Sequence, residues 1–220
     1  MADTLGQVAY GSTRNPFNYD KFEQIARDTS TAWLTLAEID NQLNLFGDTS
    51  QNTYLAGLEI AVRMAIEDYL GMSIFAQSYR VYYGIGSLYA SPVCLDLPEV
   101  SQGSTLTNGV TITSVRYYDG NTPSVLQTLL SSEYYYDVTG NKVILPNGTP
   151  SNISQNRTSP IIVEYTLSAN VIASYPVIKQ AGLLLLTHLY NNRSDTTVAS
   201  LQKIPYGVDT LLRPYKPLVM

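Results

Sequence analysis

Apolar residues recur at helical spacing in three stretches of the chain, which predicts three helices. The first begins at Thr35 and Glu38, whose spacing matches a capping box, and its stripe runs through Leu36, Ile39, Leu43 and Phe46. We expect Gly47 to end this helix. The second covers residues 52–70 with one apolar stripe, and Gly71 is its expected stop.

The second helix also carries a row of charges. Glu59, Arg63 and Glu67 lie four residues apart, on a face other than the apolar stripe. Side chains at this spacing can pair on the surface of a helix. We therefore interpret the three residues as a solvated charged face rather than as a carboxylate site.

The third helix is expected from about residue 174 to residue 193. Pro176 falls in its first turn, where a missing amide costs little. The helix is apolar most of the way round, which is typical of a helix central to a core. Its histidine, His188, has no other metal ligand near it in sequence, so we interpret it as a core or interface residue.

Between the second and third helices the pattern changes to short β-rich runs separated by turn signals. Two polar loops, residues 100–108 and 146–159, interrupt them and contain no histidine. The expected strands are residues 79–83, 109–118, 133–137, 142–145 and 161–166.

This order of elements predicts an α+β fold: a small helical bundle with an antiparallel β insertion between helix two and helix three, and an extended C-terminal tail. Within the N-terminal arm we expect a short amphipathic helix at residues 17–25. The expected segments are an arm (1–31), two bundle parts (32–74 and 171–203), the β insertion (75–170) and a docking tail (204–220).

The tail combines apolar residues with prolines that block a long helix. The tail cannot bury Leu211, Leu212, Tyr215 and Leu218 locally. We therefore expect it to be mobile in the free subunit and ordered in the assembly, either laid into a groove of a partner or added to the edge of a sheet. The alternative is that residues 208–212 form a last core helix of their own subunit.

Composition narrows the classes of function. The net charge is −5 and the 13 Lys and Arg residues are scattered, whereas duplex-DNA binders carry a basic patch. The chain has 18 Tyr against 4 Phe, and Tyr suits surfaces that are wet in one state and buried in another. We expect an assembling protein without specific DNA binding.

Signals for chemistry are nearly absent. Cys94 is the sole cysteine, which excludes an intrachain disulfide and is typical of a small buried apolar residue. No metal-ligand spacing, complete glycine-rich loop or nucleophile motif occurs. We therefore expect no enzymatic activity, cofactor or metal. The sequence shows neither a signal-peptide pattern nor an apolar run long enough to span a membrane, so we expect a protein made in a cytoplasm.

Several segments, in this order, resemble the head-to-tail connector (adaptor or head-completion) proteins of tailed bacteriophages. The resemblance spans about residues 35–215, while the arm has no clear counterpart and the two polar loops look long. The segments include TLAEI (35–39), AIEDYLG (65–71), ITSVRYYDG (112–120), YPVIKQA (175–181) and IPYGVDTLLRPY (204–215).

The resemblance implies a structural protein of the virion neck, made in the host bacterial cytoplasm. It implies a ring of about twelve copies between the portal and the tail or stopper, with genomic DNA passing through without specific binding. It also implies that the tail faces the portal. The candidate portal-binding residues are Val208, Leu211, Leu212, Arg213, Tyr215, Lys216 and Leu218.

Two other functions stay open at this point. One is a different virion part, a tail-completion or terminator protein. The other is an enzyme with a hydrolytic site built across loops, which no sequence motif supports. Rings that depend on a portal would favour the connector, and a monomer with turnover would favour the enzyme.

Overall fold

The chain folds into two compact units in this computed structural model, which describes residues 18–84, 91–98, 109–169, 171–192 and 206–216. The strand unit contains Met1–Ala26, Gln77–Val100 and Val110–Thr166, and the helical unit contains Arg27–Ala76, Ser101–Gly109 and Leu167–Met220. The predicted mixed α+β class is confirmed.

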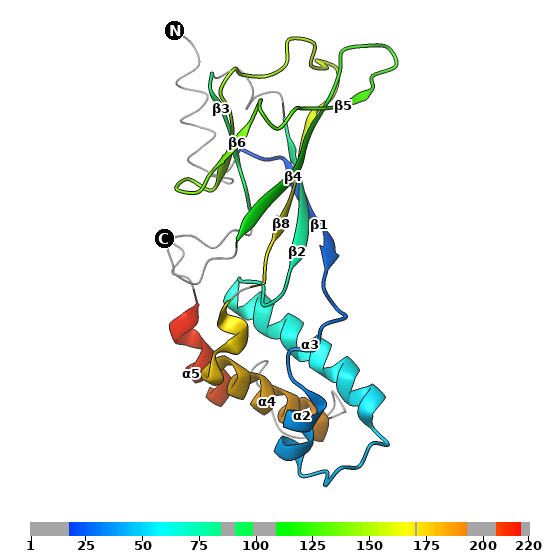
Figure 1. The fold of residues 1–220 in the computed structure, drawn as a ribbon, viewed down its shortest axis with the longest axis vertical. Helices are drawn as coiled ribbons and strands as arrows, with labels where there is room; N and C mark the ends of the chain where they lie inside the picture. Colours follow the sequence, from blue (N-terminus) through cyan, green and yellow to red (C-terminus); the bar gives the residue numbers. More distant parts are fainter. Residues whose placement is uncertain (1–17, 85–90, 99–108, 170, 193–205, 217–220) are drawn as a thin grey trace. The chain divides into compact units, whose positions relative to one another are not determined.

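Strands in the described residues form two sheets, which Figure 1 shows. The five-stranded sheet has the order β1 (Lys21–Arg27), β2 (Gln77–Tyr83), β8 (Ile161–Leu167), β4 (Val110–Tyr118) and β5 (Leu126–Thr128). The three-stranded antiparallel sheet has the order β3 (Val93–Asp96), β7 (Lys142–Leu145) and β6 (Tyr135–Asp137). Strands β3 and β5 were not expected from the sequence.

The core of the strand unit follows from the alternation of side chains along its strands. In β2 every second residue is buried, among them Val81 and Tyr83. The Tyr83 hydroxyl donates to the Asp96 carbonyl at 2.7 Å, and the Tyr165 hydroxyl donates to the Pro98 carbonyl. These two buried phenols therefore link strands of the larger sheet to the segment of β3.

The half-buried face of the larger sheet carries charges that pair across strands. The Glu164 carboxylate on β8 accepts from Arg80 Nε on β2 at 2.6 Å and from Arg116 on β4. Arg80 also donates to Glu23 on β1 at 3.2 Å. Cross-strand pairs of this kind stabilise the order of strands in a sheet.

The first strand corrects a prediction. The short helix expected at residues 17–25 is wrong for the described part, because residues Lys21–Arg27 form strand β1 of the larger sheet. Backbone bonds from Asp20 N to Tyr82 O (2.9 Å) and from Asp28 N to Ala76 O (3.1 Å) bracket it. Long-range backbone pairing thus overrides the local amphipathic pattern. Residues 1–17 lie outside the described residues.

The helical unit contains four α-helices in the described residues, all visible in Figure 1. They are α2 (Leu36–Leu43), α3 (Asn52–Leu70), α4 (Pro176–Asn191) and α5 (Tyr206–Leu212), with 3-10 turns η2 (Val171–Ser174) and η3 (Arg213–Tyr215). Their shared core includes Trp33, Leu34, Ile39, Leu55, Val62, Ile66, Leu70, Ile178, Leu185, Leu186, Val208 and Leu212.

The helix ends show what local sequence specifies. The capping box is confirmed: Thr35 Oγ1 accepts from Glu38 N at 3.2 Å, and Glu38 Oε2 accepts from Thr35 N at 2.8 Å. Gly71 ends α3 in the left-handed region. The first helix, however, ends at Leu43 with Asn44 as its left-handed cap, so Gly47 is not its stop.

Candidate functional site

The charged row on α3 is buried, so the interpretation of a solvated face is wrong. Glu59, Arg63 and Glu67 expose 2%, 0% and 4% of their surface. Buried charges persist only where they are paired or hydrogen-bonded. Their partners come from the segments that precede α2 and follow α3, which the helical pattern of α3 alone does not reveal.

Arg63 binds the segment before α2. Its Nη1 donates to the Thr31 carbonyl at 2.6 Å and its Nη2 donates to the Asp28 carbonyl at 2.7 Å. The guanidinium carbon also lies 4.8 Å from the centre of the Phe75 ring, which is within range of a cation–π interaction. The Arg63 side chain thus contacts both the segment before α2 and the segment after α3.

The two carboxylates bind backbone amides on either side of α3. Glu59 Oε1 accepts from Trp33 N at 2.9 Å and from Leu34 N at 3.4 Å. Glu67 Oε1 accepts from Ile74 N at 2.7 Å, and its Oε2 lies 3.7 Å from Arg27 Nε.

Burial raises the pKa of the Glu67 carboxyl above its ordinary range, although its hydrogen bonds from Ile74 and Phe75 oppose the shift. A raised carboxyl pKa can indicate a catalytic acid. Here Glu67 is 4% exposed and bound to the amides of its own unit, so it has no open face toward a substrate. The row Glu59, Arg63 and Glu67 therefore forms a structural clamp.

The C-terminal segment carries the candidate portal-binding residues and corrects the extended tail. Residues Tyr206–Leu212 form α5 and Arg213–Tyr215 continue it as η3. Val208 and Leu212 are 1% and 0% exposed in the core of the helical unit, as the alternative of a last core helix requires. Apolar contact with α4 supplies the burial that the short segment lacks by itself.

The remaining candidates lie on the outer side of this segment. Leu211 and Tyr215 are half-buried against the core, and Tyr215 packs edge-on against Tyr175 with ring centres 5.9 Å apart. Arg213 and Lys216 are exposed. Leu218 lies outside the described residues.

Two polar contacts hold the segment to the last turn of α3. The Tyr69 hydroxyl donates to the Asp209 carboxylate, and this bond raises the pKa of the Tyr69 phenol. The Lys216 ammonium lies 4.8 Å from the centre of the Tyr69 ring. Of the candidate residues, Arg213 and Lys216 therefore present a basic surface, while Val208 and Leu212 fix the helix that carries them.

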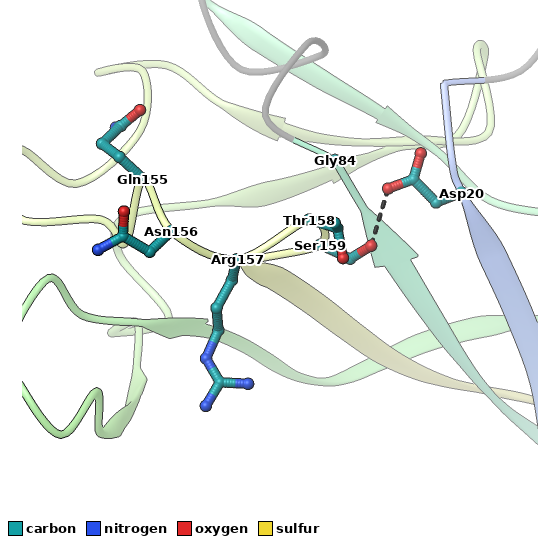
Figure 2. A pocket seen from close by; sticks show the side chains of 7 residues that line it. All are labelled: Asp20, Gly84, Gln155, Asn156, Arg157, Thr158 and Ser159. Atoms are coloured by element: carbon teal, nitrogen blue, oxygen red, sulfur yellow. Dashed lines mark hydrogen bonds between the residues drawn. The ribbon is translucent and has the colours of Figure 1, made fainter.

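An open depression of about 610 Å³ lies in the strand unit, and Figure 2 shows its lining residues from close by. Ser159 Oγ donates to Asp20 Oδ2 at 2.8 Å, and a Cβ added at Gly84 would lie 2.5 Å from the same oxygen. The Arg157 side chain points away from Asp20 and stacks on the Tyr118 ring at 3.6 Å. The other lining residues are Gln155, Asn156 and Thr158.

The depression does not assemble a reaction centre. A nucleophile or general base needs a partner within hydrogen-bond reach, and the only two ionisable lining groups, Asp20 and Arg157, do not converge. In the described part of the chain, no three His, Cys, Asp or Glu side chains meet to hold a metal ion. His188 contacts Asn192, the residue that caps the end of its helix, and Cys94 is half-buried in β3.

Among the helices of the described residues, none combines the length and apolar character needed to cross a membrane.

Comparison with known proteins gives a structural likeness without a sequence match. No protein-family model and no curated protein matches the chain. A chain in the neck of an empty gene transfer agent (GTA) particle, computed with C6 symmetry, aligns with TM-score 0.60 and 19% identity over 91% of this chain and 97% of that chain.

Two further solved structures agree. A chain in the virion of a native GTA particle has TM-score 0.58 and 18% identity, with 90% and 96% of the two chains covered. A chain in the neck of a native GTA particle, computed with C12 symmetry, has TM-score 0.54 and 19% identity, with 91% and 97% covered. The protein therefore has the fold of a chain found in the neck of gene transfer agent particles.

Proposed function

We propose that the protein is a structural subunit of a virion neck, a ring-forming connector that joins the portal of a phage head to the tail or stopper. The observation that carries the proposal is the likeness, over nearly the whole of both chains, to a chain in the neck of a phage-like particle. The ordered resemblance of residues 35–215 to phage connectors points independently to the same place.

The symmetry of the similar structures supports a ring. Those necks were computed with C6 and C12 symmetry, and a ring of about twelve copies obeys both. The net charge of −5 fits a channel through which genomic DNA passes without being held. On this proposal the protein is made in the host bacterial cytoplasm, is located in the virion neck and has no catalytic role.

The portal-facing surface of this proposal is the outer side of α5 and η3. Arg213 and Lys216 supply exposed charge, and Leu211 and Tyr215 supply half-buried apolar area beside it. Val208 and Leu212 are buried and act by holding the helix in place.

The test is co-assembly of the purified chain with its portal protein, followed by electron microscopy and mass measurement. We expect rings on the portal, and we expect Lys216→Glu to weaken attachment because it reverses one exposed charge. Lys21→Glu, on a side chain 63% exposed in the strand unit, is the matched control and should attach normally.

Two outcomes would contradict the proposal. If the chain does not bind the portal but binds the end of a tail tube, it is a tail-completion or terminator protein. A chain that stays monomeric with portal present and turns over a substrate is an enzyme.

A further inference from the structure

The outer side of α3 lacks the charges that the solvent-facing side of a helix normally carries. Between Asn52 and Ile66 the only charged residues of the helix are Glu59 and Arg63, and both are buried. The residues that share the outer side lie three or four apart along the chain. They are the exposed Thr53, Ala56, Gly57 and Ala61 and the half-buried Ile60 and Met64. We call these six residues the uncharged face.

The opposite side of α3 packs within its own subunit. Leu55, Val62 and Ile66 belong to the core of the helical unit, and the charged clamp binds backbone groups before and after the helix. The helix thus has charges inside and uncharged residues outside, which reverses the arrangement of an ordinary surface helix. Such a reversal indicates a face that is covered when the protein is assembled.

Gly57, in the middle of the uncharged face, is not required by the packing of its own subunit. A Cβ added there would meet no heavy atom of the described residues within 4 Å, whereas one added at Gly182 in α4 would lie 2.7 Å from the Trp33 ring. A glycine inside a helix is less favourable than an alanine, because it loses more backbone freedom on folding. Gly182 allows close packing inside the subunit, and Gly57 leaves the same room for a backbone that approaches from outside.

The surroundings of the uncharged face are also suited to contact with a protein. Phe46, on the connection from α2, is 94% exposed, and Tyr54, in the first turn of α3, is 41% exposed. Exposed aromatic residues are enriched at the centres of protein–protein contacts. The helix presents an exposed charge only in its last turn, at Asp68.

The chemistry of the uncharged face selects the class of partner. DNA is bound through cations, and the six residues of the face include none. Permanent contacts between copies of one chain are more apolar than contacts between proteins that associate transiently. The necks that contain similar chains were computed with C6 and C12 symmetry, and each copy in a closed ring contacts the next copy. A second copy of this chain is therefore the partner that fits the face.

The uncharged face is separate from the proposed portal-facing surface. The helix α5 is held to the last turn of α3 by the bond from the Tyr69 hydroxyl to Asp209. Gly57 precedes Tyr69 by roughly 18 Å along the helix axis. Figure 1 shows the first turns of α3 and α5 at opposite ends of the helical unit. A second copy can therefore bind the uncharged face while the portal-facing surface stays free.

We propose that the uncharged face of α3 is the surface through which one subunit binds a second copy of this chain, with Gly57 at the point of closest approach. The inference rests on the proposed function, because that function supplies the ring.

The first test measures self-association of the purified full chain by sedimentation equilibrium, without portal. Ala61→Lys should raise the dissociation constant about tenfold or more, because it places an unpaired charge in the contact. Lysine favours a helix nearly as well as alanine, so the variant should keep its circular dichroism and its midpoint in urea. Val138→Lys adds the same charge at a residue 72% exposed in the strand unit and is the control, which should associate like the wild type.

Gly57→Ala separates the contact from the stability of the subunit. The added methyl group lies in open space and favours the helix, so the midpoint in urea should rise. The same methyl group blocks the close approach of a second copy, so the dissociation constant should rise several-fold. A glycine with a role only inside its own subunit would give a lower midpoint in urea instead.

The second test identifies the protein that covers the face. An Ala61→Cys variant in a Cys94→Ser chain is labelled with a photoreactive benzophenone and irradiated in the presence of the portal protein. We expect a cross-linked product with the mass of two copies of this chain. The same label at Val138→Cys should give little of this product.

Three results would overturn the contact: normal association of Ala61→Lys, a cross-link from residue 61 to the portal, or a wild-type chain that is monomeric and gives no two-copy product. The proposed function is measured separately, by attachment to the portal. Self-association through the uncharged face without attachment would refute the function and keep the contact. Rings on the portal that form equally well with Ala61→Lys would do the reverse.

Discussion

Removing the Arg63 guanidinium should destabilise the helical unit severely. Arg63 is 0% exposed and donates to two backbone carbonyls, at 2.6 Å and 2.7 Å. Hydrogen bonds from charged groups contribute about 1.5–3 kcal/mol each, so Arg63→Ala should lower the free energy of unfolding by about 3–6 kcal/mol before lost packing is counted. That is a large part of the about 5–15 kcal/mol that holds a typical domain together.

Urea unfolding followed by tryptophan fluorescence measures this effect directly. Trp33 is the only tryptophan, is 4% exposed and belongs to the core of the same unit. Arg63→Met keeps most of the stem that packs near Phe75 and should cost less than Arg63→Ala. The exposed Arg213→Ala should change the free energy of unfolding by less than about 0.5 kcal/mol. A loss below about 1 kcal/mol for Arg63→Ala would refute the clamp.

Four further predictions concern the core, the buried Glu67 and the charge of the chain. Gly182→Ala should cost about 1–3 kcal/mol and shift the Trp33 emission, because the added Cβ would lie 2.7 Å from two ring carbons; an unchanged midpoint in urea would contradict it. Leu185→Asp should abolish stable folding, since it buries an unpaired charge at a site 4% exposed, and a folded variant by circular dichroism would refute the core assignment. The difference in free energy of unfolding between the wild type and Glu67→Gln should shrink as pH rises above about 4.5, because the raised pKa of Glu67 lets the folded state keep a proton that the unfolded state loses. A difference that grows with pH would refute this. Duplex DNA should bind weakly at physiological salt, and submicromolar binding in a filter assay would contradict the charge argument.

The structure of the C-terminal segment was only partly predictable from the sequence. The sequence marks residues 204–216 as apolar and broken by proline, and this pattern led to both an extended tail and a core helix as alternatives. The choice between them depends on whether α4 offers Val208 and Leu212 a place in the core, which no local pattern encodes. The exposure of Phe46 was missed for the same reason. At helical spacing it continues the stripe of Leu36, Ile39 and Leu43, but α2 ends before reaching it.

The sequence by itself determined the features that depend on residues close to one another along the chain. The Thr35–Glu38 capping box, Pro176 at the start of α4 and Gly71 at the end of α3 satisfy or relieve backbone groups within a few residues, so their effect is the same in any fold. The bounds of α3 and the main strands follow from hydrophobic periods of 3.6 and 2, which are equally local.

Only the tertiary structure decided which polar groups are buried and which segments pair. The row Glu59, Arg63 and Glu67 has the spacing of a solvated face, and distant backbone groups made it a buried clamp instead. Residues 21–27 became a strand because β2 lies beside them. The physical reason is common to both: a hydrogen bond or an apolar contact to a residue far along the chain changes the energy of a segment as much as its own sequence does, and that partner is present only once the chain has folded.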